Sequence, residues 1–255
     1  MSRRIGAYWW AGLILAVVVP DKGWSDDWTQ WRGVQRDGKS AEVDLLDSWP
    51  AEGPKLLWQT DDLGAGYSTP SAAAGRVFVM CNTNSQEQVI ALSLADGQPL
   101  WTSQIGKVGA NRGPQYPGAR STPTVDGDWI YALGSDGDLV CLNAESGMAR
   151  WSKNLRTDFD GQPGAWAYAE SPLIDGDVLI CSPGGRSATV VALDKANGSV
   201  RWKPALAEGD DASYSSRIVA TIDGVKQYVL FLAKGAVGLD AETGDALWRY
   251  SKTAD

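Results

Sequence analysis

Histidine is absent from the 255 residues of this chain, and its absence excludes several kinds of active site. A Ser-His-Asp triad, a Cys-His pair, a histidine-ligated haem and an HExxH zinc site each require an imidazole ring. Cysteine is also scarce, because the chain has only Cys81, Cys141 and Cys181, which form no CxxC or CxxCH motif. Each lies in a strand-like apolar stretch, which predicts buried thiols. A single disulfide with one remaining thiol is the alternative.

Positive charge is limited as well. Lys and Arg number 23 against 31 Asp and Glu, which gives a net charge of −8 at pH 7. Such a surface repels a phosphate backbone, so we expect no nucleic-acid partner. Phenylalanine is rare, with three residues against 13 Trp and eight Tyr. Trp and Tyr must therefore supply most of the aromatic surface that the core buries.

The longest apolar stretch stands at the N-terminus, where residues 1–25 resemble a secretory signal peptide. Arg3 and Arg4 provide the positive start, and residues 5–19 form a mostly apolar stretch that is short for a membrane span. Small residues favour a cut after Ser25. The sequence therefore predicts export to the periplasm or beyond. The alternative is an uncleaved anchor, through which alone the protein would contact a membrane.

One pattern recurs in four copies along the chain. Each copy has an alternating apolar stretch that ends in Leu, then Ser, Asn or Asp, then a Gly, and a Trp four residues after that Gly. The copies end at Trp101, Trp151, Trp202 and Trp248. The Ser, Asn or Asp side chain favours a turn, and the Gly suits its left-handed position. Each copy therefore predicts a β-hairpin whose Trp lies on the returning strand.

A second hairpin precedes each copy, and Asp-Gly pairs mark several of its turns. Two hairpins in succession make a four-stranded antiparallel sheet, and several such sheets around an axis make a β-propeller. The chain is therefore predicted to be all-β, with four-stranded antiparallel blades. The predicted repeats span residues 64–105, 118–155, 168–206 and 213–253, approximately.

The fourth copy, AVGLDAETGDALW at residues 236–248, resembles the repeat of the pyrroloquinoline quinone (PQQ) propeller family. That family includes quinoprotein alcohol and sugar dehydrogenases, a propeller lipoprotein of the outer-membrane assembly machinery, and secreted bacterial proteins of unknown role. Residues 26–53 are similar to the lead segment of that last group. The resemblance implies a PQQ-like β-propeller in residues 54–255, after the lead segment.

The segment PKLLWQT at residues 54–60 matches only the final strand of a repeat, because no hairpin precedes Trp58. In propellers closed by strand exchange, such a strand completes the last blade. Members of the family usually close with more than four blades. We therefore expect about four blades of an incomplete ring, and a chain that is an N-terminal fragment. A compact four-bladed ring is the alternative.

Two long segments, residues 106–120 and 156–170, carry Arg, Tyr and Trp among Gly and Pro. On the propeller they would gather at one mouth of the central channel, where ligand sites lie. The candidates for that mouth are Tyr67, Arg112, Tyr116, Arg120, Trp166, Tyr168, Glu170, Tyr214, Arg217 and Lys234.

The resemblance implies that Arg could pair with the carboxylates of PQQ and that a Trp could stack on its ring. On this basis the predicted cofactor-binding residues are Arg112, Arg120, Trp166, Tyr168, Glu170 and Arg217. The alternative is that they are loop anchors and contacts between blades.

The catalytic members of the family require an Asp general base and a calcium ion held by acidic and amide side chains. They often carry a vicinal Cys pair, which is missing here. The Asp-Gly-Asp runs at residues 126–128, 136–138 and 175–177 stand where hairpin turns are expected, and none continues as a calcium loop. We therefore predict no catalytic residue and no metal ligand.

Three functions follow from the resemblance. We favour an exported PQQ-like propeller that acts as a ligand-binding or protein-interaction scaffold, with a protein or small molecule at its mouth. The first alternative is a quinoprotein oxidoreductase that uses PQQ and calcium on alcohols or sugars. The second is a platform for outer-membrane protein assembly, although that lipoprotein needs a Cys after its signal and this chain has none there.

Overall fold

The computed structural model describes residues 26–110, 118–206 and 210–252. The predicted signal peptide, residues 1–25, lies outside these ranges. Within them, no helix is both long and apolar enough to cross a membrane. The predicted boundary between the lead segment and the propeller stays a prediction.

The described residues form four sheets, each with four antiparallel strands that pair in chain order. The first sheet contains β1 (Ser71–Ala73), β2 (Arg76–Thr83), β3 (Gln86–Ser93) and β4 (Pro99–Lys107). The second contains β5 (Thr124–Asp126), β6 (Trp129–Leu133), β7 (Asp138–Asn143) and β8 (Ala149–Asn154). A short helix, α1 (Leu155–Phe159), follows it.

The last two sheets have the same plan. The third contains β9 (Leu173–Asp175), β10 (Val178–Cys181), β11 (Val191–Asp194) and β12 (Val200–Trp202). The fourth contains β13 (Ile218–Ile222), β14 (Val225–Leu232), β15 (Gly235–Asp240) and β16 (Ala246–Tyr250). The predicted all-β class with four-stranded antiparallel blades is confirmed.

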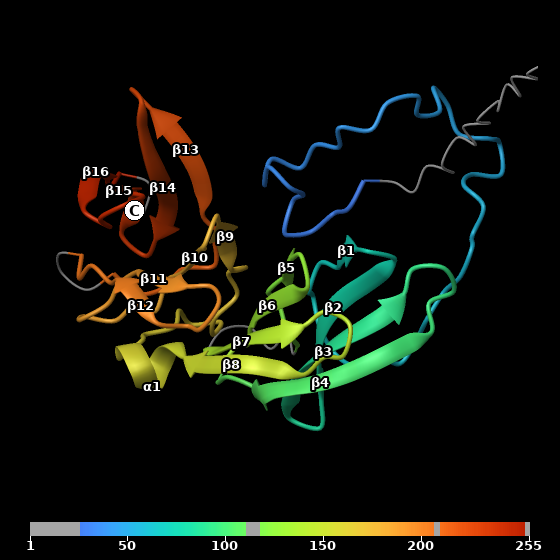
Figure 1. The fold of residues 1–255 in the computed structure, drawn as a ribbon, viewed down its shortest axis with the longest axis horizontal. Coiled ribbons are helices and arrows are strands. Elements are labelled where there is room, and N and C mark those ends of the chain that lie inside the picture. Colours follow the sequence, from blue (N-terminus) through green and yellow to red (C-terminus); the bar gives the residue numbers. More distant parts are fainter. Residues whose placement is uncertain (1–25, 111–117, 207–209, 253–255) are drawn as a thin grey trace, which may run out of the picture.

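The sheets stand side by side along an open arc (Figure 1). The first strand of each sheet (β1, β5, β9 and β13) lies on the inner side of the arc, and the last strand (β4, β8, β12 and β16) lies outside. This is the radial arrangement of propeller blades, with about four blades and no closed ring among the described residues.

The turns follow the chemistry that the sequence predicts. In the fourth sheet, the Asp240 carboxylate accepts hydrogen bonds from the backbone N–H groups of Glu242 and Thr243, each at 2.9 Å. Gly244 then adopts a φ of 80°, in the left-handed region that favours glycine. The side chain before the turn and the Gly within it therefore fix the hairpin locally.

Apolar side chains fill the space between neighbouring sheets, because each strand alternates its side chains between the two sheet faces. Three buried clusters join the sheets in pairs: Phe78, Met80, Val89, Ile130 and Val140 between the first and second; Tyr131, Leu139, Leu179 and Leu193 between the second and third; Ile180, Ala192, Tyr228 and Leu230 between the third and fourth. The three cysteines are buried free thiols, as predicted.

The repeated Trp residues tie each sheet to the next. The indole N–H of Trp101 donates to the backbone oxygen of Ala144 at 3.1 Å, and that of Trp151 donates to the backbone oxygen of Lys195 at 2.9 Å. A Cβ atom on Gly147 would lie 2.6 Å from the Trp101 ring. The Gly of one repeat therefore also makes room for the Trp of the repeat before it.

Trp58 makes the same contact with the first sheet. Its indole N–H donates to the backbone oxygen of Leu94 at 2.8 Å, and a Cβ atom on Gly97 would lie 2.5 Å from its ring. At the other end of the arc, Trp248 donates within its own sheet, to Gln227 Oε1 at 2.7 Å. Trp58 therefore occupies the place that the Trp of a preceding blade would take.

Candidate functional site

Four short segments of the same design lead into the inner strands. We call them the entry tetrapeptides: Tyr67-Ser68-Thr69-Pro70, Arg120-Ser121-Thr122-Pro123, Ala169-Glu170-Ser171-Pro172 and Tyr214-Ser215-Ser216-Arg217. Each one ends immediately before β1, β5, β9 or β13. Because the sheets are arranged around one axis, the repeat brings all four entry tetrapeptides to the inner side of the arc.

The entry tetrapeptides line a cavity of about 600 Å³, which we call the axial cavity. Residues two apart in an extended chain point the same way, so the first and third positions can face one space. The first residue of all four tetrapeptides lines the cavity. The third residue also lines it in the tetrapeptides that precede the first, third and fourth sheets. With two further side chains, the lining consists of Trp31, Tyr67, Thr69, Arg120, Trp166, Ala169, Ser171, Tyr214 and Ser216.

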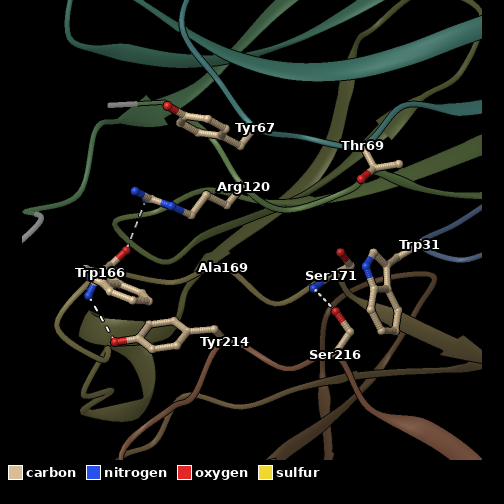
Figure 2. A pocket seen from close by; sticks show the side chains of 9 residues that line it. All are labelled: Trp31, Tyr67, Thr69, Arg120, Trp166, Ala169, Ser171, Tyr214 and Ser216. Carbon is tan, nitrogen blue, oxygen red and sulfur yellow. Dashed lines mark hydrogen bonds between the residues drawn. The ribbon is translucent and has the colours of Figure 1, made fainter. Parts of the chain in front are cut away.

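Figure 2 shows that the axial cavity has two chemically different ends. At the arginine end, Arg120 Nη1 donates to the backbone oxygen of Trp166 at 3.3 Å. The backbone N–H of Trp166 in turn donates to the hydroxyl of Tyr214 at 3.2 Å, and the two rings lie 5.1 Å apart at an angle of 34°. Tyr67 lies at the same end, so a guanidinium stands among three aromatic rings.

At the other end, which we call the hydroxyl end, Ser171 and Ser216 lie beside the Trp31 ring (Figure 2). The backbone N–H of Ser171 donates to Ser216 Oγ at 2.9 Å, and the backbone N–H of Thr122 donates to Ser171 Oγ at 2.9 Å. These bonds fix the two serine side chains between adjacent sheets. The hydroxyl end therefore has a rigid backbone frame and one large aromatic wall.

The lead segment (residues 26–53) supplies that aromatic wall. It pairs with the inner edge of the first two sheets, where Ala72 N–H donates to the Trp28 oxygen at 2.9 Å and Val125 N–H donates to the Thr29 oxygen at 2.7 Å. Trp31 lies two residues after Thr29 and is half-buried. The wall therefore comes from a segment that precedes every blade in the chain.

Arg36 fixes the lead segment to the third sheet. Its side chain is buried, and its guanidinium donates to Gln30 Oε1 at 2.8 Å and to the backbone oxygens of Pro172 and Ser171 at 3.0 and 3.1 Å. The guanidinium carbon also stands 5.5 Å from the Trp31 ring centre. Burial lowers the pKa of Arg36 to about 10, so the side chain remains charged at neutral pH.

Glu170 and Arg217 depart from the entry tetrapeptide pattern and bind each other instead. Both are 1% exposed and form an ion pair between the third and fourth sheets. Glu170 Oε1 also accepts from the backbone N–H of Ser182 at 2.6 Å, and Arg217 donates to the backbone oxygen of Ile180. Burial lowers the pKa of Arg217 well below its ordinary value, and the nearby Arg36 lowers it further.

The structure brings together some of the predicted site residues and separates others. Arg120, Trp166, Tyr67 and Tyr214 line the axial cavity. Tyr168, Glu170, Arg217 and Lys234 are not among the lining residues; the Tyr168 hydroxyl donates to the backbone oxygen of Pro183 at 2.8 Å. Arg112 and Tyr116 lie outside the described residues. Cofactor binding by the six predicted residues stays a prediction.

Sequence reasoning missed five lining residues, namely Trp31, Thr69, Ala169, Ser171 and Ser216. For four of them a signal was present, because the entry tetrapeptides repeat in register before each inner strand. For Trp31 no local signal exists, since its position depends on contacts that Arg36 makes with residues far along the chain.

The described lining residues offer a guanidinium, hydroxyls and aromatic rings to a ligand. Among them Arg120 is the one charged side chain, and none carries a carboxylate or a thiol. Among the described residues, no group of three or more His, Cys, Asp or Glu side chains is placed to hold a metal ion. The guanidinium and aromatic rings suit a planar carboxylate such as PQQ. The described lining residues do not fit a calcium-bound quinone, because that requires acidic ligands and a carboxylate base.

Comparison with protein families gives one match over most of the chain. A family model described as "Outer membrane protein assembly factor BamB" matches residues 24–115 and 85–255. The outer membrane protein assembly factor BamB of Burkholderia pseudomallei is 24% identical over 197 residues, which cover 74% of this chain and 45% of that protein. The quinoprotein ethanol dehydrogenase of Pseudomonas aeruginosa is 29% identical over 174 residues, which cover 64% of this chain and 26% of the dehydrogenase.

Solved structures share the architecture. The crystal structure of BamB from Moraxella catarrhalis superposes with a TM-score of 0.58 at 16% identity, over 79% of this chain and 56% of that one. At this identity the likeness establishes the fold alone. The chain spans less than half the length of the two sequence relatives named above.

Proposed function

This chain belongs to the PQQ-like repeat family whose model is described as "Outer membrane protein assembly factor BamB", and from that premise we propose that it is an exported protein-interaction scaffold. The axial cavity is its binding site, and its ligand is a segment of a partner protein. The relatives that are named assembly factors support a protein partner. Export rests on the signal-like residues 1–25.

The composition of the axial cavity carries this proposal. Trp, Tyr and Arg are the residues most enriched among those that dominate binding energy at protein interfaces. The lining has two Trp, two Tyr and one Arg among its nine residues, with Thr and Ser hydroxyls beside them. Rigid aromatic rings with adaptable hydroxyls are also the composition of antibody binding loops.

A quinoprotein oxidoreductase is the second candidate. Two observations favour it: the similarity to the quinoprotein ethanol dehydrogenase, and a guanidinium that stands among aromatic rings at the arginine end. The described lining residues include no acidic side chain, which weighs against it. A more specific version of the scaffold, a platform for outer-membrane protein assembly, rests on the names of the relatives alone.

The test is site-specific photocrosslinking in the cells from which the gene comes. A benzophenone amino acid replaces Tyr67 at the axial cavity in the full chain. As a matched control it replaces Met148, which is 72% exposed on an outer turn. We expect discrete crosslinked proteins from position 67 that are absent from position 148 and disappear in the Arg120→Ala background.

A lack of crosslinks specific to position 67 would contradict the proposal. If position 67 yields no protein that position 148 does not, the scaffold proposal is wrong. The second measurement is then whether added PQQ with calcium quenches Trp fluorescence in the wild-type chain and whether Trp166→Phe reduces that quenching. That outcome would favour the oxidoreductase.

A further inference from the structure

The two ends of the axial cavity specify the chemistry of what enters it. Resting on the proposed function, we infer that the cavity binds an acidic side chain and a neighbouring large apolar side chain on a loop of the partner protein. The carboxylate binds Arg120 at the arginine end, and the apolar side chain packs against Trp31 at the hydroxyl end.

Charge selects the acidic group. Among the described lining residues Arg120 is the one charged side chain, in a protein whose net charge is −8. The guanidinium therefore attracts an acidic ligand to the cavity although the protein as a whole is negatively charged. A guanidinium presents its N–H donors in a plane that matches the two oxygens of a carboxylate. A cationic ligand would meet Arg120, and the described lining residues include no carboxylate to bind it.

Shape selects a neighbouring apolar group. Trp31 and Arg120 stand at opposite ends of one cavity of about 600 Å³ (Figure 2). Pockets of this size hold a small ligand or a few side chains. A carboxylate alone would leave the Trp31 end unfilled. A large apolar side chain next to the acidic residue would cover the indole ring and remove its exposed part from water.

The backbone groups favour a side-chain carboxylate over a chain terminus. Free carboxyl termini are captured by clusters of backbone N–H groups. At the hydroxyl end, the N–H groups of Ser171 and Thr122 already donate to Ser216 Oγ and Ser171 Oγ, each at 2.9 Å. These N–H groups therefore do not form such a cluster, and the cation of Arg120 is the anion-binding group that the lining provides.

Arg36 is a positioning residue for this site. It touches no ligand, but its hydrogen bonds to Pro172 and Ser171 hold the segment that carries Trp31. Loss of these bonds should affect the apolar end of the ligand and leave the carboxylate preference unchanged. This gives Arg36 and Arg120 different expected signatures, although both are arginines.

The experiment measures binding of two short peptides to the full chain by NMR of the indole N–H groups. One is acetyl-Phe-Glu-Phe-amide, and its matched control is acetyl-Phe-Gln-Phe-amide, which has the same shape and no charge. We expect the Glu peptide to bind about tenfold more tightly at about 50 mM NaCl, with the ratio shrinking at about 500 mM because salt screens exposed charges. The signals of Trp31 and Trp166 should move, while those of Trp101 and Trp151 stay and report intact blades.

Variants separate the two ends. Arg120→Gln should bring the affinity ratio of the two peptides close to one, and Arg120→Lys should retain part of it, because an ammonium keeps the charge without the planar pair of donors. Trp31→Ala and Arg36→Gln should weaken both peptides by a similar factor and keep the ratio. In every variant, unchanged Trp101 and Trp151 signals show that the blades remain folded.

Several outcomes would overturn the inference. Equal affinity for the Glu and Gln peptides would refute the acidic ligand, as would a ratio that survives Arg120→Gln. Tighter binding of acetyl-Gln-Phe with a free carboxyl terminus would assign the site to chain ends. If neither peptide binds while position 67 still crosslinks a protein, the ligand chemistry is wrong and the scaffold stands. If the Glu peptide binds but no protein crosslinks, the scaffold is wrong.

Discussion

At the scale of single residues, Glu170 and Arg217 show how the repeat accommodates exceptions. Three of the four entry tetrapeptides have Ser at the second position and three have Pro at the fourth, and the exceptions are Glu170 and Arg217. Where an acid and a base replace these small residues, they pair across the two sheets with 1% exposure each. Each charged residue stabilises the fold only when the other is present, because a buried charge without a partner lowers the free energy of unfolding strongly.

This pairing leads to a prediction on stability. Glu170→Ala or Arg217→Ala alone leaves one buried charge without its partner, and each should lower the free energy of unfolding by about 3–5 kcal/mol. The double variant Glu170→Leu/Arg217→Met removes both charges and should cost clearly less than the sum of the single changes. Urea denaturation of the full chain measures all of them. Additive costs would show that the two side chains do not depend on each other.

The predicted cofactor-binding residues fall into two groups in the structure. Arg120 and Trp166 were found from the sequence because they lie in unusual loops between repeats, and both line the axial cavity. Glu170 and Arg217 belong to the same predicted set, yet the structure buries them against each other. A charged residue near a mouth can bind a ligand or another charged residue, and sequence position does not separate the two.

At the scale of elements, the hairpin that ends each repeat has two separate constraints on its Gly. The backbone at Gly147 has a φ of 71°, and a Cβ atom there would lie 2.6 Å from the Trp101 ring. Gly127 has a φ of 56° but no heavy atom within 4 Å of such a Cβ atom. The two turns therefore share the backbone constraint and differ in packing.

The comparison gives a second prediction. Gly127→Ala should lower the free energy of unfolding by about 1–2 kcal/mol, the cost of a left-handed conformation for a residue with a side chain. Gly147→Ala should cost about 1–3 kcal/mol more, because it also forces the Trp101 ring away from its site. Thermal unfolding followed by circular dichroism measures both. Equal costs would mean that the Trp–Gly contact does not hold adjacent sheets together.

At the scale of the whole molecule, the Trp residues at the two ends of the arc make different contacts among the described residues. Trp58 fits the turn of the first sheet as Trp101 fits the turn of the second. Trp248 has its partner, Gln227, within the fourth sheet. The segment around Trp58 belongs to no sheet among the described residues, so the indole contact is its main fixed point.

A third prediction concerns this segment. Trp58→Ala should release residues 54–60 from the first sheet and speed trypsin cleavage after Lys55, because proteolysis follows local opening. Trp166→Ala, at the axial cavity, is the matched control and should leave that cleavage rate unchanged. Mass spectrometry of timed digests measures the rates. Equal rates in wild type and Trp58→Ala would show that other contacts hold the segment.

The sequence by itself determined the blades, because every signal that builds them acts over a few residues. Alternating apolar residues set each strand, and an Asp or Asn such as Asp240 and a Gly such as Gly244 set each turn. The repeat of that local chemistry also placed one side chain of each sheet at the axis.

Only the tertiary structure decided the binding site. Trp31 reaches the axial cavity because Arg36 binds the backbone of residues 171 and 172, and Glu170 is withdrawn from it because Arg217 stands opposite. These contacts join parts of the chain that no local pattern relates. Their geometry depends on how the sheets pack, since buried polar groups take whichever partner the packed structure brings within hydrogen-bonding distance.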